Sequence, residues 1–350
     1  MLNVPIRVLV PGTGAHFRCG GLSVSLQTAR LLSRLRPTDV VTYRRRQPDH
    51  PFLDDLLSQQ DAPGNALWIV SWGFDVPQLL RKLKGRPVVY QAHSSGYGFD
   101  LPPGVPVLAV SRNTLGYWGD RAPRNPLFLV PNALEPVWFE RGARHLAANS
   151  RPLDVLVQRR KSSDYVLRKL VPALRARGLR VEVQDGWVND LVDLFNNAKV
   201  YIYDSAEHWR AVGVSEGFGL PPLEAMACGC VVFSSINHAL ADTLTPGEIG
   251  HQIGCGSLDH DVSRIVAATA EPANWSLSTE ELNMFLETYS ESASLERWHN
   301  VLLRLDALLP MLANGVVLKS KPLWRQRLKR YVRGFSRVLN RVRSWPVRCL

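Results

Sequence analysis

The sequence predicts two α/β domains, each built on a parallel β-sheet with helices on its faces. Three observations lead to this fold class. The chain has 350 residues, which suits two domains of ordinary size. Short apolar runs of strand length alternate with longer stretches of helical period, a pattern typical of strand–helix–strand units in parallel sheets. The alternation is interrupted once, by the polar segment 141–152, and then begins again.

The first half of the chain predicts an N-terminal domain over residues 1–148. Residues 6–10 predict its first strand, and residues 22–35 predict a helix that Pro37 ends. Further runs are rich in β-branched or aromatic residues and are bounded by Gly, Pro or polar residues. They predict strands at 40–43, 66–70, 88–91, 107–110 and 127–130.

The second half predicts a C-terminal domain over residues 149–312. Its apolar runs predict strands at 153–157, 180–183, 200–203 and 230–234. Helical patterns lie between and after them, at 165–176, 190–196, 221–226 and 294–309. We expect the last of these helices to close the second domain and a separate tail to occupy residues 313–350.

The composition excludes several classes of protein. Hydrophobic residues make up 45% of the chain and charged residues 21%, as in ordinary globular proteins. The five cysteines form no C-x-x-C pair, which favours a reduced, cytoplasmic protein. Residues 1–14 lack the features of a signal peptide, and no apolar run approaches the length of a membrane span.

The net charge of +11 belongs to the C-terminal tail. Residues 319–350 hold eleven of the 42 Lys and Arg residues and no Asp or Glu, which leaves 31 basic against 31 acidic residues elsewhere. Apolar residues of the tail recur at helical steps, at Trp324, Leu328, Tyr331, Phe335, Val338, Val342 and Trp345.

A basic amphipathic helix of this kind predicts attachment to an anionic membrane surface. We therefore expect a peripheral protein on the cytoplasmic, inner face of a membrane. One alternative is that the apolar stripe packs on the N-terminal domain. Another is a nucleic-acid-binding arm, which the neutral body of the protein disfavours.

The most informative segment is residues 215–229, SEGFGLPPLEAMACG. Gly217 and Gly219 leave the backbone bare, so that it can approach a ligand closely. Pro221 or Pro222 suits the first turn of a helix, so the segment predicts a glycine loop that leads into a helix N-terminus. Such an end binds phosphate through free N–H groups. Glu224, in or near the first turn, can accept hydrogen bonds from ribose hydroxyls, and Glu216 precedes the loop.

This segment resembles the donor-site signature of the retaining GT-B glycosyltransferases of family four, the glycosyl transferases group 1 type. That family has two glutamates separated by seven residues in the string EGFGLPxLEAMAxG. The resemblance implies that Glu216 contacts the donor sugar and that Glu224 holds the nucleotide ribose. It also implies that backbone N–H groups of Phe218, Gly219 and Leu220 bind the diphosphate or the sugar. A plain acidic helix cap would explain Glu224 alone.

Other positions resemble the same family. Gly20 and Gly21 match a glycine-rich loop near the reacting centre, although a tight turn is an alternative. His93 matches a histidine that contacts the donor sugar, although a lone histidine is often structural. Arg160 and Lys161 match two cations that stabilise the leaving diphosphate. Here the match departs from the common form, which has a glycine before the Arg and a spacer before the Lys.

Three more segments bear on the site. By resemblance, the loop 185–189 holds the base through backbone groups such as that of Val188, while Trp187 stacks on the base or packs in the core. The segment 206–214 is longer than the family pattern and carries His208, Trp209 and Arg210, which shape the site or belong to an exposed loop. The Asp-His-Asp sequence at 259–261 is expected to cap a helix and not to bind metal.

The resemblance implies a GT-B fold, in which two Rossmann-like domains face a central cleft and the basic tail helix follows. It implies a retaining transferase that moves a sugar from a nucleotide sugar to a glycan or lipid-linked glycan, without metal, other cofactor or nucleic acid. The role expected is synthesis of cell-surface polysaccharide. Alternatives are a sugar-nucleotide epimerase or a phosphorylase of the same fold, or a non-catalytic nucleic-acid-binding adaptor.

Overall fold

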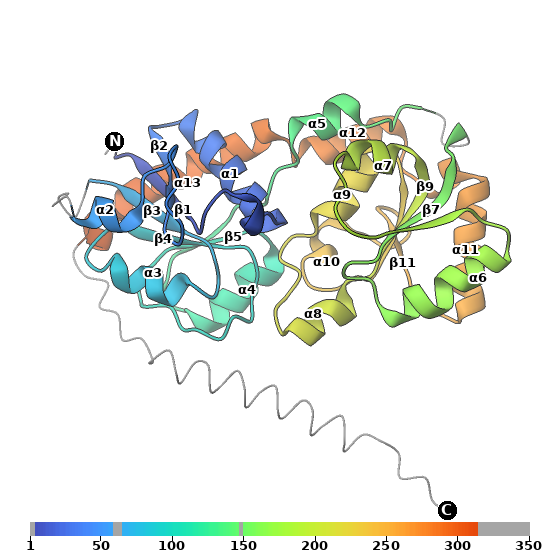
Figure 1. The fold of residues 1–350 in the computed structure, drawn as a ribbon, viewed down its shortest axis with the longest axis horizontal. Helices are drawn as coiled ribbons and strands as arrows, with labels where there is room; N and C mark the ends of the chain where they lie inside the picture. The colour runs from blue at the N-terminus through green and yellow to red at the C-terminus, as the bar shows by residue number, and fades with distance from the viewer. Residues whose placement is uncertain (1–3, 59–64, 147–149, 314–350) are drawn as a thin grey trace, which may run out of the picture.

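The computed structural model describes residues 4–58, 65–146 and 150–313 and shows two α/β domains side by side (Figure 1). The N-terminal domain is built on six parallel strands in the order β2-β1-β3-β4-β5-β6. All six strands predicted for this half are confirmed, with small shifts at their ends. They are β1 (Ile6–Val10), β2 (Thr38–Thr42), β3 (Leu67–Val70), β4 (Val88–Ala92), β5 (Val107–Ala109) and β6 (Leu127–Leu129).

Helices cover both faces of this sheet. On one face lie α2 (Leu53–Ser58), α3 (Val76–Lys82) and α4 (Arg112–Arg121), whose apolar side chains share a core with Trp68 and Tyr90. On the other face lies α1 (Gly20–Ser33), the helix predicted at 22–35. A short helix, α5 (Pro136–Arg141), follows β6 and packs its Trp138 into the core of the second domain.

The C-terminal domain is built on five parallel strands in the order β11-β10-β9-β7-β8. They are β7 (Leu153–Gln158), β8 (Val181–Gln184), β9 (Ala198–Tyr203), β10 (Val231–Ser234) and β11 (His251–Gln252). The four predicted strands are confirmed, whereas β11, only two residues long, was not predicted. The neighbours β7 and β9 mark the point at which the strand order changes direction, where ligands bind in doubly wound sheets.

Helices also cover both faces of the second sheet. One face carries α7 (Leu191–Asn196), α9 (Leu220–Ala227) and α12 (Thr279–Glu287). The other carries α6 (Val171–Ala176) and α11 (Leu258–Ala270). The helix predicted at 165–176 includes a π-helical stretch, Val166–Leu170, and Pro172, which follows two residues later, has no N–H to continue a regular ladder. Two short helices, α8 (Ala206–Val212) and α10 (Leu240–Thr243), follow β9 and β10.

The last described helix corrects an expectation. The helix predicted at 294–309 was placed in the C-terminal domain, but α13 (Glu291–Ala313) crosses back and packs beside α1 on the N-terminal sheet (Figure 1). Its apolar stripe shares a core with strands β1, β3 and β4 through Trp298, Val301, Leu302, Leu305, Leu309 and Leu312. A buried ion pair fixes the crossing, because Arg36, in the segment after α1, donates to Asp306 at 3.0 Å.

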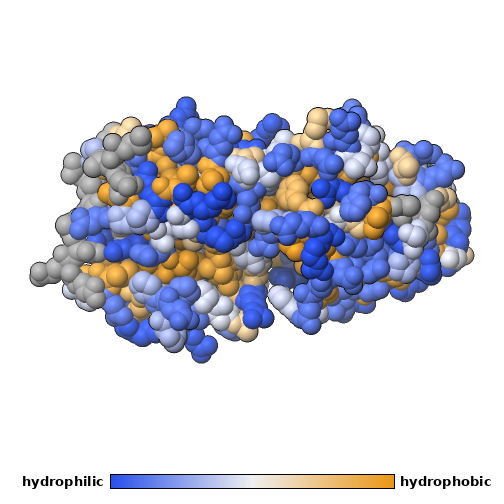
Figure 2. All heavy atoms as spheres, turned by 90° about the horizontal axis from the view of Figure 1, so that it is seen from above, coloured by the Kyte–Doolittle hydropathy of each residue, from blue (hydrophilic) through white to orange (hydrophobic). Residues whose placement is uncertain are grey.

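Seen from above, the molecule shows a notch at one edge between its two halves, and its apolar patches lie mainly over the N-terminal half (Figure 2). Among the residues described, no helix combines the length and the apolar character needed to cross a membrane. The basic tail predicted at 319–350 lies outside the described residues.

Candidate active site

The segment with the two glutamates forms the loop and helix predicted for it. Residues 215–219 form the loop, and α9 begins at Leu220 with Gly219 at its N-cap in the left-handed region (φ +84°). The backbone N–H groups of Phe218, Gly219 and Leu220 donate to no acceptor within the described ranges. The Phe218 side chain is buried in the domain core. The loop therefore offers only backbone donors, which suit an anion at a helix N-terminus.

The glycines of this loop are required by contacts inside the protein. A Cβ on Gly217 would lie 1.5 Å from the carbonyl oxygen of His93, and one on Gly219 would lie 2.4 Å from the Leu240 side chain. We expected the bare backbone to serve the approach of a ligand. At Gly217 it also allows the close approach of the N-terminal domain, because His93 follows β4 of that domain.

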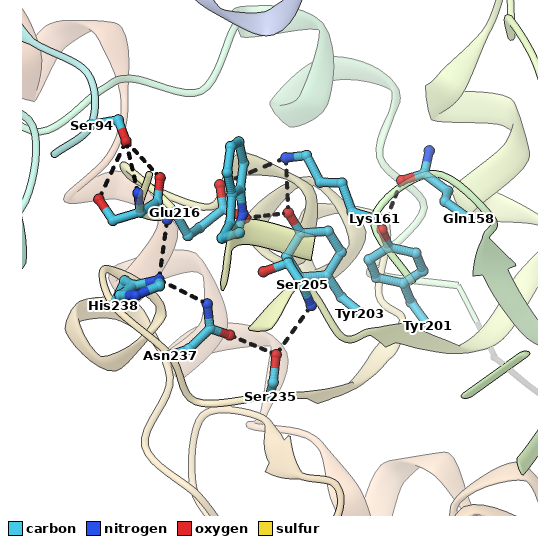
Figure 3. A network of polar contacts seen from close by, with 12 residues as sticks. Ser94, Gln158, Lys161, Tyr201, Tyr203, Ser205, Glu216, Ser235, Asn237 and His238 are labelled. Atoms are coloured by element: carbon cyan, nitrogen blue, oxygen red, sulfur yellow. Dashed lines mark hydrogen bonds and ion pairs between the residues drawn. The ribbon is translucent and has the colours of Figure 1, made fainter. Parts of the chain in front are cut away.

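Glu216 is buried in a network of polar contacts at the carboxyl ends of β7, β9 and β10 (Figure 3). Its Oε2 accepts hydrogen bonds from the Tyr203 hydroxyl at 2.5 Å and from the Trp209 indole N–H at 2.6 Å. Its Oε1 lies 3.7 Å from Lys161 Nζ. Its backbone N–H donates to Nδ1 of His238, whose φ of +52° is uncommon outside glycine. The carboxylate is thus held in a fixed orientation.

Lys161 follows β7 and also has a left-handed backbone, with φ of +77°. Its Nζ donates to the Tyr203 hydroxyl oxygen at 3.1 Å and lies 4.7 Å from the centroid of the Trp209 ring. Burial lowers the pKa of Lys161, and the charge of Glu216 opposes that shift. Arg160 is exposed. Of the two cations predicted for the leaving group, only Lys161 contacts the Glu216 network.

Glu224 lies at the start of the second turn of α9, near the first turn as expected. Burial raises its pKa to about 8, the charge of Glu135 adds to the shift, and Lys161 opposes it. Its carboxyl group makes no hydrogen bond or ion pair in the part of the chain that the structure describes. It is therefore a half-buried acceptor that is free to receive hydroxyl groups.

The predicted residues of the N-terminal domain behave differently from one another. The ring of His93 is desolvated, which lowers its pKa to about 4, and its Nε2 finds no partner among the described residues. Gly20 and Gly21 open α1, and a Cβ on Gly20 would meet nothing within 4 Å. Neither glycine has a positive φ, so the backbone conformation requires glycine at neither position. The alternative that these glycines only form a tight turn therefore gains no support.

A cluster of serines joins the two domains beside Glu216. Ser94 Oγ donates to the backbone carbonyl of Ser215 at 2.6 Å, and Ser95 donates to Ser215 Oγ from its backbone N–H at 3.0 Å. The backbone N–H of Ser215 donates in return to Ser95 O at 3.2 Å. A Cβ on Gly96 would lie 2.7 Å from the carbonyl oxygen of Gly213, so the two loops touch along their length. No pattern in the sequence predicts this contact.

The loop 185–189 opens onto solvent. Trp187 is 72% exposed, so the alternative that it packs in the core is wrong. Its indole N–H donates to Asn189 Oδ1 at 3.1 Å, and the guanidinium of Arg18, from the loop after β1, lies 5.9 Å from its ring centroid. The neighbouring Val188 is half-buried. Residues 187 and 188 make no direct contact with the Glu216 network in the described ranges.

The segment 206–214 proves to be largely helical, since α8 occupies Ala206–Val212. The exposed-loop alternative is wrong for Trp209, which is half-buried and bonded to Glu216. His208 packs edge-on against the Trp209 ring with centroids 4.9 Å apart, while Arg210 is exposed. Tyr203 was also missed as a site residue, although it ends a predicted strand at the sheet edge where ligands bind.

The Asp-His-Asp sequence at 259–261 lies in the first turn of α11. Ser257 caps α11, and Asp261 is buried, where it accepts hydrogen bonds from the Tyr165 hydroxyl at 2.7 Å and from the Gly254 N–H at 2.8 Å. The capping role expected of this sequence therefore belongs to Ser257. Across the described residues, no group of three or more His, Cys, Asp or Glu side chains is placed to bind a metal ion.

Residues 175–272, which include α8, α9 and both glutamates, match the family model of glycosyl transferases group 1. The resemblance predicted from the segment 215–229 is thereby confirmed. A comparison of the sequence with curated proteins found no match.

Solved structures show that the similarity in fold extends over both domains. Sucrose-phosphate synthase from Thermosynechococcus elongatus is 15% identical, with a TM-score of 0.59 over 87% of this chain and 99% of that one. Anabaena HepE in complex with UDP and glucose is 13% identical, with a TM-score of 0.60 over 86% and 100%. The lipopolysaccharide outer core galactosyltransferase WaaB is 13% identical, with a TM-score of 0.55 over 86% and 99%. The chain therefore has the GT-B fold, and this fold together with the match of residues 175–272 to the family model supports glycosyl transfer from a nucleotide sugar.

Proposed function

We propose that this protein is a retaining glycosyltransferase that moves a sugar from a nucleoside-diphosphate sugar to a glycan or lipid-linked glycan. The observation that carries the proposal is the arrangement around α9. Free backbone N–H groups at its N-terminus, Glu216 beside the loop and Lys161 at the end of β7 lie together at one sheet edge. A diphosphate requires the donors and the cation, and a sugar requires the carboxylate.

The proposed mechanism needs no protein nucleophile. The acceptor hydroxyl attacks the anomeric carbon from the side on which the diphosphate departs, and the departing phosphate oxygen takes the proton of that hydroxyl. Negative charge grows on the diphosphate as the bond breaks, so Lys161 and the N–H groups of Phe218 and Gly219 stabilise the transition state more than the ground state. Arg160, which is exposed, is proposed to approach the diphosphate once it is bound.

In this proposal the two glutamates bind different parts of the donor. Glu216 accepts hydroxyls of the sugar, and Glu224 accepts those of the ribose. HepE has been solved with UDP and with UDP-glucose, which makes uridine the first base to test here. The exposed ring of Trp187 and the backbone at Val188 are proposed to border the base, and His93 and the loop at Gly20 and Gly21 the reacting centre.

Titrations with free nucleoside diphosphates and with the corresponding sugar nucleotides test this division. Glu224→Ala is expected to weaken both kinds of ligand, by about 1–3 kcal/mol, because ribose hydroxyls lose their acceptor. Glu216→Ala is expected to weaken only the sugar nucleotides. If both variants bind both ligands as the wild type does, the assignment of the site is wrong.

Product analysis separates transfer from the alternative reactions of this fold. A transferase leaves the sugar nucleotide largely intact until an acceptor glycan is added, and the new linkage keeps the anomeric configuration of the donor. An epimerase would convert the sugar nucleotide without any acceptor, and a phosphorylase would need inorganic phosphate. Activity is expected to persist in EDTA, because Lys161 and backbone donors take the place of a metal. A strict requirement for Mn²⁺ or Mg²⁺ would contradict the proposed leaving-group site.

We also propose that the acceptor is built at a membrane, in the synthesis of cell-surface polysaccharide on the cytoplasmic face. The support is the composition of residues 319–350 and the similarity in fold to a lipopolysaccharide galactosyltransferase. Each cation near an anionic leaflet contributes on the order of 1 kcal/mol. The full chain is expected to float with anionic liposomes at low salt and not with neutral ones, whereas a chain ending at Leu318 should float with neither. Equal flotation of both chains would contradict the proposal.

A further inference from the structure

The contact between α8 and Glu216 has no part in the binding roles proposed above. The indole N–H of Trp209 and the hydroxyl of Tyr203 both donate to Oε2 of Glu216, at 2.6 and 2.5 Å. No hydrogen bond of the described residues ends on Oε1, and its nearest cation, Lys161 Nζ, is 3.7 Å away. Figure 3 shows Glu216 between Lys161 and Tyr203 on one side and His238 on the other. The two carboxylate oxygens therefore have different environments.

Both groups that donate to Oε2 of Glu216 can act toward it only as hydrogen-bond donors. An indole N–H can only donate, so it cannot reverse its role. Burial and the charge of Glu216 raise the pKa of Tyr203, which keeps its proton. The Tyr203 oxygen in turn accepts a hydrogen bond from Lys161 at 3.1 Å, and this contact fixes the direction in which the hydroxyl points. Because two donors already occupy Oε2, an incoming hydroxyl group meets free lone pairs only on Oε1.

We infer that Trp209 is a positioning residue that fixes the Glu216 carboxylate so that Oε1 receives a hydroxyl of the donor sugar, which makes α8 a determinant of sugar specificity. The inference rests on the proposed function. The same ring lies over Lys161 Nζ, with 4.7 Å between the nitrogen and the ring centroid. Trp209 therefore borders both the carboxylate that recognises the sugar and the cation proposed for the diphosphate.

Trp209→Phe removes the N–H and keeps an aromatic ring beside Lys161, so it isolates the hydrogen bond. Calorimetric titrations would use UDP, GDP, ADP and dTDP and their glucose and galactose esters. We expect Trp209→Phe to weaken the preferred sugar nucleotide about tenfold and its free diphosphate less than twofold. The wild-type preference between the glucose and galactose esters should shrink as well. A general loss of structure would weaken all of these ligands together.

Two comparisons make the result specific. Trp275→Phe is the same substitution in the same domain, at a ring that packs against Phe233 and His251, and it should change none of these affinities. Glu216→Gln tests the proposed function itself. If Glu216→Gln weakens the sugar nucleotide and Trp209→Phe does not, the role of Trp209 is wrong and the proposed function stands. If no sugar nucleotide binds, or if Glu216→Gln does not change the affinity for sugar nucleotides, the proposed donor site is wrong. The role proposed for Trp209 is then wrong as well.

Discussion

The backbone of Gly217 in the C-terminal domain lies against the carbonyl oxygen of His93 in the N-terminal domain, so closely that a Cβ at position 217 would be 1.5 Å from that oxygen. The serine contacts of Ser94 and Ser95 with Ser215 lie in the same two loops. The donor-site loop is therefore shaped partly by the opposite domain. A glycine in a family signature can in this way report on the meeting of two domains as well as on a ligand.

Gly217→Ala is expected to separate these loops. Since the clashing atom belongs to the backbone, the free energy of unfolding should fall by about 1–3 kcal/mol, the usual range for overpacking. Gly20→Ala is the matched control, because its Cβ meets nothing within 4 Å and alanine favours a helix by about 0.5–1 kcal/mol. Urea unfolding of both variants measures the difference. Equal midpoints would show that the domains do not approach here in solution.

Leu305→Ala should destabilise the N-terminal domain although it lies near the C-terminal end of the described chain. Leu305 is 1% exposed within the core that α13 shares with the first sheet, so its truncation should cost about 2–5 kcal/mol. Leu303 on the same helix is 39% exposed, and Leu303→Ala should change stability by less than about 0.5 kcal/mol. Hydrogen exchange in β1 and β3 should rise only in the first variant. Faster exchange confined to the second sheet would contradict the packing of α13.

Glu224 should make stability depend on pH in a defined direction. Its pKa is about 8 in the folded protein against 4.5 ordinarily, so the folded state holds a proton that the unfolded state releases between these values. Its contribution is therefore fully present below pH 4.5 and is lost as the pH rises towards 8. Glu224→Gln, which cannot ionise, should match the wild type near pH 4 and become progressively more stable than it up to pH 8. A constant difference across this range would contradict the shift.

Lys161→Met keeps most of the length of the side chain and removes its charge. If Lys161 stabilises the leaving diphosphate, kcat should fall by about 10²–10³, as when one preorganised donor is removed from a transition state. Arg168→Ala provides a control, since Arg168 is an exposed cation of the same domain that pairs with the exposed Asp164. Steady-state kinetics with saturating sugar nucleotide would measure both variants. An unchanged kcat in Lys161→Met would assign the leaving group to other donors.

Most of the fold could be predicted from the sequence because buried parallel strands leave a strong local pattern. The strands from Ile6 to Ser234 appear as short apolar runs, and only β11, with two residues, gave no such signal. The placement of α13 could not be predicted in this way. An apolar stripe such as that of Trp298 and Leu305 indicates that one side of the helix is buried. It does not indicate which of the two sheets covers that side.

The part of the candidate site that lies in one continuous segment could be predicted from the sequence. The part that forms where distant segments meet in space could not. Glu216 and Glu224 stand in one string with recognisable spacing. Trp209 and Tyr203 contact Glu216 because β9, α8 and the loop before α9 converge in space, and no spacing along the chain encodes that convergence. The raised pKa of Glu224 could not be predicted from the sequence for the same reason. It follows from burial and from the charge of Glu135, which lies in the segment that joins the domains.

The return of α13 to the first sheet also has a consequence for how the protein is made. The six strands of the N-terminal sheet have left the ribosome once residue 129 has emerged, but the helix that completes one of its faces starts at Glu291. Throughout synthesis of the second domain, the nascent chain therefore carries an apolar sheet face that α1 covers only in part. Domains usually finish folding in the order in which they are translated. Here the first domain to appear is the last to be finished, because part of its core comes from residues 291–313.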